Sequence, residues 1–92
     1  MTPPIVLLHG WGLSSAVWAP LQAQLDPQLT VYAPDLPGHG NAAPASDTLA
    51  SWAEALLTHI PDGSLLVGWS PGAQLAMHLA VHAPQKIDRL VL

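Results

Sequence analysis

Four short, mainly hydrophobic segments recur along the chain, and the first of them, residues 5–8, is continuously apolar. Runs of this length and composition are typical of strands that are buried on both faces of a sheet. They predict four strands, over residues 5–8, 29–33, 64–67 and 87–92.

Between these runs, hydrophobic residues recur at the spacing of amphipathic helices. They are Val17, Trp18, Leu21 and Leu25 in the first helix, and Leu49, Trp52, Ala53, Leu56, Leu57 and Ile60 in the second. Ser14 or Ser15 can cap the first helix. Asp47 or Thr48 can cap the second, and both helical tryptophans are expected to pack in the core. A third helix, rich in alanine and leucine, is predicted over residues 73–82.

The alternation of strands and helices favours an α/β fold with a parallel sheet and right-handed crossovers. We therefore expect a partial α/β-type domain with about four parallel strands and three crossover helices. Three loops, at residues 9–12, 35–40 and 69–71, each follow an expected strand. These loops should gather at the carboxyl edge of the sheet, where ligands bind in folds of this kind.

The composition suits one small domain in which part of the hydrophobic surface is left uncovered. The chain has 92 residues, of which half are hydrophobic and only 9% are charged. This is apolar for a small domain, which has much surface to cover. Part of the covering is therefore expected to lie outside this chain.

Charge and residue usage exclude several classes of function. The net charge is -4 and Lys86 and Arg89 are the only strong cations, so no basic face for nucleic acid can form. No apolar stretch reaches the roughly 18 residues that span a bilayer. Residues 1–4 carry neither the charged nor the apolar segment of a signal peptide. Without cysteine there is no disulfide framework or thiolate nucleophile. A cytoplasmic protein that binds neither nucleic acid nor membrane is expected.

The segment 68–72, Gly-Trp-Ser-Pro-Gly, fits the pattern G-x-S-x-G between an expected strand and an expected helix. A direct turn from strand to helix holds the serine in a strained conformation with its Oγ projecting, and Gly68 and Gly72 leave room for the close backbone approach. The start of the following helix favours negative charge developing nearby. Ser70 is therefore the candidate catalytic nucleophile. The alternative is a turn of small residues in which Ser70 only caps the helix.

The loop His9-Gly10-Trp11-Gly12 follows the first expected strand. Acyl transfer needs backbone N–H groups aimed at the developing oxyanion, and one normally comes from this loop while the other comes from the residue after the nucleophile. Gly10 lets the backbone approach a substrate, and Trp11 can wall an acyl pocket. The alternative is a tight turn with Trp11 in the core. We expect His9 to be a hydrogen-bonded structural residue rather than a base.

The other candidate side chains favour structural roles. Asp35 is expected to hold its loop through hydrogen bonds to nearby backbone, and neither Asp35 nor His39 is expected to be catalytic. His78 and His82 lie eight and twelve residues beyond the candidate serine, roughly 12 and 18 Å away along a helix axis. His59 is expected at the surface.

In their order and spacing, the motifs at residues 9–12, 35–40 and 68–72 resemble the α/β-hydrolase family over essentially the whole chain. The tryptophan before Ser70 resembles the sequence of BioH-type carboxylesterases at this position, where many other relatives have histidine. Members of that family hydrolyse pimeloyl-[acyl-carrier-protein] methyl ester in biotin synthesis. The resemblance implies that Ser70 is the nucleophile and that Trp11 and Pro71 contact the substrate. It also implies an ester substrate, which can be carried on acyl carrier protein, and no metal or organic cofactor.

The chain departs from the family pattern in its coverage. Family members carry the catalytic acid and histidine after the nucleophile, which places both beyond residue 92 together with the lid. The chain thus resembles the N-terminal third of one core domain, without the hairpin that often precedes its first strand. A serine without an adjacent base is a weak nucleophile. We therefore expect the 92-residue chain by itself to be inactive.

Pro71 is a second departure, because proline has no N–H to donate to an oxyanion. Removing one such donor typically slows catalysis about 100- to 1000-fold. Proline is nevertheless favoured at the first position of a helix, so Pro71 is compatible with folding. Gly72 N–H or a second donor from residues 10–12 can compensate for the missing one.

Three interpretations follow from these observations. The first is a BioH-type serine carboxylesterase, and the second is another α/β-hydrolase, such as a thioesterase, a lactonase or a cofactor-free haloperoxidase. The third is a non-catalytic module, which is either a truncated gene product or a scaffold that binds a carrier protein or a second chain. The expected last strand, residues 87–92, would expose an apolar edge. Such edges pair with other chains, so self-association or a partner chain is expected.

Overall fold

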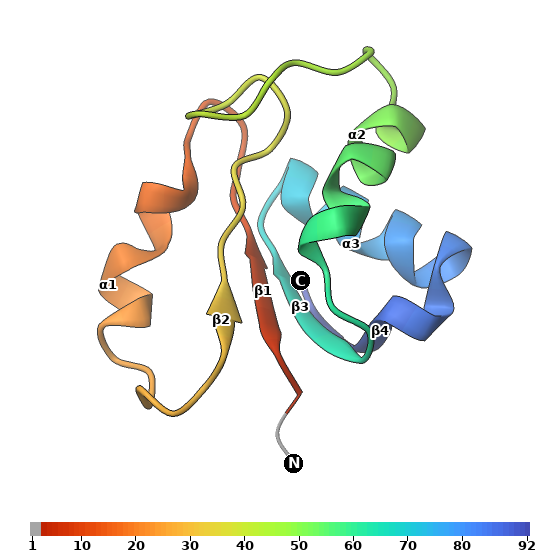
Figure 1. Ribbon diagram of the computed structural model, residues 1–92. Coiled ribbons are helices and arrows are strands. Elements are labelled where there is room, and N and C mark those ends of the chain that lie inside the picture. The colour runs from red at the N-terminus through yellow and green to blue at the C-terminus, as the bar shows by residue number, and fades with distance from the viewer. Residues whose placement is uncertain (1–2) are drawn as a thin grey trace.

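The computed structural model describes residues 3–92 and shows one parallel sheet with helices on both faces (Figure 1). The strands are β1 (Ile5–Leu8), β2 (Val31–Tyr32), β3 (Ser64–Gly68) and β4 (Ile87–Val91), in the spatial order β2-β1-β3-β4. All neighbouring strands are parallel, so the predicted α/β class with four parallel strands is confirmed. Residues 1–2, which belong to the segment searched for a signal peptide, lie outside the described residues.

Three α-helices connect the strands, each at a place where a helix is predicted. They are α1 (Ala19–Gln22), α2 (Leu49–Leu56) and α3 (Pro71–His82), accompanied by the 3-10 turns η1 (Ser15–Trp18), η2 (Leu57–His59) and η3 (Pro84–Lys86). α1 lies on one face of the sheet, and α2 and α3 cover the other (Figure 1). Within residues 3–92, no helix is both long and apolar enough to cross a membrane.

The helix starts follow from capping side chains that the sequence predicts. The Ser14 hydroxyl accepts a hydrogen bond from Ala16 N–H at 3.3 Å, before η1. The Thr48 hydroxyl accepts one from Ser51 N–H at 3.1 Å, before α2. Each cap satisfies a backbone donor that the first turn would otherwise leave unpaired.

The first helix and the second strand differ most from the predicted lengths. The first helix divides into η1 and α1, because Pro20 has no N–H to donate to the Ala16 carbonyl. That carbonyl instead accepts a hydrogen bond from Ala19 N–H, three residues on. The strand predicted over residues 29–33 is reduced to β2, which pairs with only the first two residues of β1.

The main core lies between the sheet and the helices α2 and α3. It is formed by Val6, Leu8, Leu36, Ala53, Leu56, Ile60, Leu66, Leu75, Ala76 and Leu79. Trp52 packs against this cluster, as predicted, whereas Trp18 is half-buried and lies outside it. Leu49, predicted on the apolar face of α2, is 41% exposed at the start of that helix.

The outer edge of β4 is paired with no other strand of the described chain. Along this edge the exposed fraction rises from 36% at Leu90 to 50% at Val91 and 61% at Leu92. The predicted exposure of the last strand is therefore confirmed.

Candidate active site

The loops that follow β1 and β2 are joined side by side at the carboxyl edge of the sheet, as predicted (Figure 1). Leu36 N–H donates to His9 Nε2 at 2.9 Å. Gly12 N–H donates to His39 Nε2 at 3.0 Å. Each hydrogen bond links one loop to the other across 27 residues, so the two loops form one unit.

Ser70 occupies the sharp turn between β3 and α3. Its φ of 60° and ψ of -119° make it the one non-glycine residue with positive φ in the described chain. This conformation is strained for a residue that has a Cβ, and it persists only where the surroundings enforce it. Ser70 is exposed and its hydroxyl caps no N–H of α3. The alternative in which Ser70 serves as a helix-capping side chain is therefore wrong.

Gly68 and Gly72 permit the backbone contacts that enforce this turn. A Cβ on Gly68 would lie 2.5 Å from the Gly72 carbonyl oxygen and 2.6 Å from Ala73 Cα. A Cβ on Gly72 would overlap the carbonyl oxygen of Leu8, at the end of β1. The first turn of α3 therefore packs directly on backbone, and a side chain at either glycine would displace Ser70.

On the α3 side of Ser70, no backbone N–H is available to a bound oxyanion from the two residues that follow it. Pro71 has no N–H. Gly72 N–H already donates to the Trp69 carbonyl oxygen at 3.0 Å. Compensation by Gly72, which the sequence leaves open, is therefore contradicted by this hydrogen bond.

In the loop after β1, some amides are engaged and others are not. Gly12 N–H donates to His39, and Leu13 N–H donates to the Gly10 carbonyl oxygen at 3.3 Å. Within residues 3–92, the N–H groups of Gly10 and Trp11 donate to no protein group. These two amides are the remaining donors that this loop can offer.

His9 is a structural residue, as predicted from the sequence. It is fully buried, and its Nε2 accepts the hydrogen bond from Leu36 N–H. Nδ1 must therefore carry the ring proton, which it donates to the Gly10 carbonyl oxygen at 2.8 Å. Both ring nitrogens are occupied, so His9 cannot accept a proton from Ser70 in this arrangement.

His39 has the same pattern of hydrogen bonds in the second loop. Its Nε2 accepts from Gly12 N–H, and its Nδ1 lies 3.0 Å from the Pro37 carbonyl oxygen, to which it donates. His39 therefore fixes the geometry of the loop after β1 without being a candidate base. His59 is exposed, as predicted.

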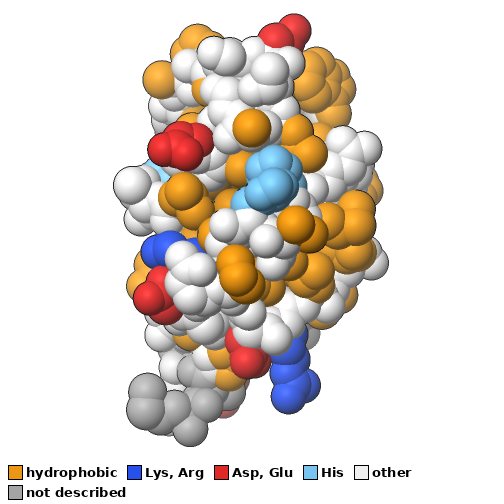
Figure 2. All heavy atoms as spheres, turned by 90° about the vertical axis from the view of Figure 1, so that its right-hand side faces the viewer, with side chains coloured by type: hydrophobic (Ala, Val, Ile, Leu, Met, Phe, Trp, Pro, Cys, Tyr) orange, Lys and Arg blue, Asp and Glu red, His pale blue; other side chains and the backbone are white. Residues whose placement is uncertain are grey.

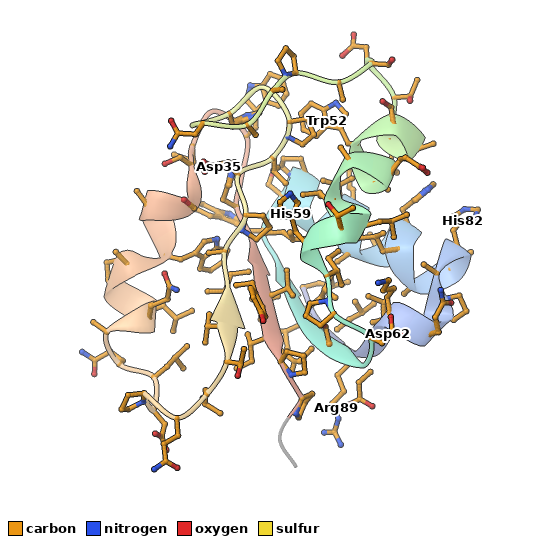
Figure 3. The ribbon with its side chains drawn as sticks, viewed as in Figure 1. Asp35, Trp52, His59, Asp62, His82 and Arg89 are labelled. Carbon is orange, nitrogen blue, oxygen red and sulfur yellow. The ribbon has the colours of Figure 1, made fainter. Side chains whose placement is uncertain are left out.

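Asp35 ties the second loop to the segment that follows the first (Figure 3). Its Oδ1 accepts from Ser15 N–H at 2.7 Å and its Oδ2 accepts from Asn41 N–H at 3.0 Å. These two hydrogen bonds lower the pKa of the carboxyl because they favour its charged form, and the bond from Ser15 has the larger effect. The predicted holding role is confirmed, and it extends to Ser15, 20 residues earlier in the chain.

Trp11 projects from the first loop and is 71% exposed, so the alternative that places it in the core is wrong. Its ring stacks on that of Trp52, with centroids 6.2 Å apart and planes within 7°. The His39 ring meets both indoles edge-on, with centroid distances of 5.3 Å and 5.7 Å. Helical periodicity places Trp52 on the buried face of α2, but it cannot reveal this contact with a distant loop.

A hollow of about 280 Å³ lies beside the turn and next to these tryptophans. It is lined by Trp11, Asp47, Thr48, Leu49, Trp52, Pro71 and Gln74. Figure 3 shows Trp52 among the loops at the carboxyl edge of the sheet. Three larger hollows lie elsewhere. Two, of about 450 and 550 Å³, have walls from the loop after β2 and from α2 and η2, and a third, of about 370 Å³, lies along α3. None of the three is lined by residues 9–12 or 68–72, so the 280 Å³ hollow is the one next to the turn that holds Ser70.

The sequence has close relatives of known name. The chain is 47% identical over 90 residues to a pimeloyl-[acyl-carrier protein] methyl ester esterase of Aromatoleum aromaticum, covering 98% of this chain and 36% of that protein. It is 40% identical to a protein of the same name from Vibrio campbellii, covering 97% and 35%. The chain therefore spans about a third of the length of these relatives.

Solved structures share the same arrangement of strands and helices. A marine microorganism esterase matches with a TM-score of 0.86 at 25% identity, covering 98% of this chain and 36% of that one. The epoxide hydrolase CorEH matches with a TM-score of 0.79 at 30% identity, covering 97% and 34%. The sequence profile described as alpha/beta hydrolase fold matches residues 3–92. With its parallel sheet and the turn at Ser70, the chain belongs to the α/β-hydrolase fold family.

Proposed function

We propose that this chain forms the N-terminal part of a cytoplasmic serine carboxylesterase that hydrolyses pimeloyl-[acyl-carrier-protein] methyl ester in biotin synthesis. The observation that carries the proposal is Ser70, which is exposed and strained at the start of α3. The names of relatives at 47% and 40% identity support the substrate. Residues 1–92 would supply the nucleophile to a core domain whose lid, acid and histidine belong to other residues.

Ser70 Oγ attacks the ester carbonyl while its proton passes to a base outside the described residues, and a tetrahedral intermediate with an oxyanion forms. The intermediate expels methanol and leaves an acyl-enzyme, which water then hydrolyses. The N–H groups of Trp11 and Gly10, which donate to no protein group within residues 3–92, bind that oxyanion. The positive end of α3 adds a favourable field, because its backbone dipoles point at the reacting atoms. No step requires a metal or an organic cofactor.

The hollow beside Pro71 receives the acyl chain in this proposal. Its walls include the stacked indoles of Trp11 and Trp52. Burying a methylene group stabilises a complex by about 0.8 kcal/mol, so a chain of methylenes gains affinity from these apolar surfaces. An acyl carrier protein outside the hollow would present the ester.

The described chain does not supply a general base. His9 and His39 lie near the turn, but hydrogen bonds occupy both nitrogens of each ring. A serine hydroxyl without a base is a weak nucleophile near neutral pH. We therefore propose that the 92 residues alone are catalytically inactive.

Pro71 favours a second candidate, a non-catalytic module that keeps the fold and binds an acyl group or carrier protein without cleaving it. The residue after the nucleophile normally provides an oxyanion donor, and here neither Pro71 nor Gly72 can do so. Another α/β-hydrolase reaction, such as thioester or lactone hydrolysis, meets the same obstacle because it passes through a similar oxyanion.

Hydrolysis of p-nitrophenyl butyrate tests whether the 92 residues alone are inactive. The 92-residue chain and its Ser70→Ala variant should release p-nitrophenol at equal rates. Turnover by the wild-type chain that Ser70→Ala abolishes would show that a base is present after all.

A chimera tests the catalytic proposal itself. Residues 1–92 would be joined to the remaining two thirds of the Aromatoleum relative, which supplies the missing regions. We expect Ser70-dependent ester hydrolysis, and we expect Pro71→Leu to raise kcat by up to about 100-fold through the restored N–H. Pro84→Leu, at an exposed position in η3, is the control. A folded chimera without Ser70-dependent activity, with or without Pro71→Leu, would favour the non-catalytic candidate.

A further inference from the structure

Two histidines on α3 lie together, away from the turn that holds Ser70. His78 and His82 are one helical turn apart, and their ring centroids are separated by 4.2 Å with planes tilted by 34°. His82 is exposed and His78 is half-buried. Within residues 3–92 neither ring takes part in a hydrogen bond, so their nitrogens are free of protein partners.

The surface around this pair has room for an ion and its water ligands. A hollow of about 370 Å³ is lined by Leu49, Gln74, Met77, His78, Val81 and His82. Figure 2 shows a cluster of histidine atoms in the middle of this face, with hydrophobic side chains around it. Figure 3 shows His82 at the outer side of α3, pointing away from the sheet.

We propose that His78 and His82 form a binding site for one divalent transition-metal ion on the exposed side of α3. Residues at i and i+4 share one helix face, so both imidazoles can reach a common ion. Imidazole nitrogen is a preferred ligand of zinc, copper and nickel. Nothing in the esterase proposal uses these residues, so the site is independent of that activity.

The ring geometry suits shared coordination. Two imidazoles bound at about 2.0–2.1 Å and at roughly a right angle would have centroids about 4.5 Å apart. The observed centroid separation of 4.2 Å is close to this value. An ion between the rings links two successive turns near the end of α3, so its binding also stabilises the folded helix.

The site has two strong protein ligands, and water completes its coordination. Among the residues described, no group of three or more histidines, aspartates and glutamates could hold a metal together. Met77 and Gln74 line the same hollow, and a thioether or an amide oxygen is a weaker ligand than imidazole. Selectivity then follows the intrinsic order of affinity for nitrogen ligands, with Cu²⁺ bound more tightly than Ni²⁺ or Zn²⁺. Mg²⁺ and Ca²⁺, which prefer oxygen ligands, should not bind.

The experiment titrates the full 92-residue chain with Cu²⁺, Zn²⁺ and Mg²⁺ while the histidine ring signals are followed by NMR. Substoichiometric Cu²⁺ should broaden the signals of His78 and His82 before those of the other three histidines. Zn²⁺ should shift the same two sets of signals and raise the Tm, and Mg²⁺ should do neither. Cu²⁺ bound at the amino terminus would leave both histidine signals unbroadened, and would overturn the proposal.

Single-histidine variants show whether His78 and His82 bind one ion together or bind separate ions independently. His78→Gln and His82→Gln should each weaken Zn²⁺ binding by at least about tenfold, because a second ligand on the same scaffold acts at high effective concentration. His59→Gln is the matched control, since His59 is exposed and stands alone on η2, and it should leave the affinity unchanged. Circular dichroism checks that each variant is folded. A folded His82→Gln variant that binds Zn²⁺ as tightly as the wild type would overturn the proposal.

Discussion

Asp35 shows how one carboxylate can hold two parts of the site in register. It accepts hydrogen bonds from the amides of Ser15 and Asn41, which lie on either side of it in the sequence. Its pKa is lowered in the folded chain, so folding favours the charged carboxylate. The resulting stability is present above the unfolded pKa of about 3.9 and is lost as the pH falls through the lower folded value.

Asp35→Asn should therefore lower the free energy of unfolding at pH 7 by about 1–2 kcal/mol, since an amide cannot accept both hydrogen bonds. The difference between variant and wild type should shrink as the pH falls below about 4. Urea unfolding at pH 7, 4 and 3 measures this difference in the free energy of unfolding. Asp47→Asn is the control, because Asp47 is exposed and accepts no hydrogen bond within residues 3–92. A difference that grows on acidification would contradict the assignment.

Ser70 is the candidate nucleophile, and its backbone conformation lowers the stability of the fold. A non-glycine residue held in such a conformation costs of order 1–3 kcal/mol. Glycine adopts positive φ freely, so Ser70→Gly should unfold at a higher denaturant concentration than Ser70→Ala, with a gain of about 1 kcal/mol. Equal stability of the two variants would mean that the turn is not strained at Ser70.

At the scale of elements, the packing of α3 on β1 depends on the lack of a side chain at Gly72. Gly72→Ala would force a Cβ onto the Leu8 carbonyl oxygen and within 2.9 Å of that of His9. Backbone cannot yield as a side chain does, so we expect a loss of about 2–4 kcal/mol or failure to fold.

Gly10→Ala is the comparison for Gly72→Ala, because its added Cβ would lie 3.4 Å from the Trp69 ring, an ordinary contact. Its cost should stay below about 1.5 kcal/mol. Thermal unfolding of both variants by circular dichroism gives the difference. A Gly72→Ala variant as stable as Gly10→Ala would show that α3 can move away from β1.

Local signals in the sequence predict most of the elements. The apolar run at residues 5–8 is β1 to the residue, and the caps at Ser14 and Thr48 start helical segments as expected. The length of β2 depends on how far a neighbouring strand pairs with it, and no local pattern records that.

The candidate site is predictable only in part, for a similar reason. The turn at Ser70 has a sequence signature because its neighbouring glycines are needed by local geometry. The stack of Trp11 on Trp52 and the hydrogen bond from Gly12 to His39 join segments far apart in the chain. Their formation depends on side-chain placement in three dimensions, which periodicity does not encode.

On the scale of the whole molecule, the sheet is unevenly covered. α2 and α3 cover one face, whereas the single turn of α1 lies beside only part of the other (Figure 1). The outer edge of β4 adds exposed hydrophobic residues and unpaired backbone groups. Surfaces of this kind pair with further strands, so we propose that the 92-residue chain self-associates or binds a partner chain along β4.

Val91→Lys tests that proposal, because a lysine on an edge strand opposes pairing with a second chain. Val91 is 50% exposed, so the change should have little effect on the fold. The wild-type chain should sediment as a concentration-dependent mixture of species, and the variant should shift toward monomer. Val81→Lys, at a 73% exposed position on α3, controls for added charge. A wild-type chain that is monomeric at every concentration would contradict the proposal.

The strand order also has a consequence for synthesis on the ribosome. β1 lies at the centre of the sheet, yet its partner Leu65 follows Ile5 by 60 residues. At translation rates of about 5–20 residues per second, β1 waits roughly 3–12 seconds for that neighbour. During this interval β2 is the only strand paired with β1, and it pairs with only the first two residues of β1, so the backbone edge of β1 that later binds β3 stays open on the nascent chain.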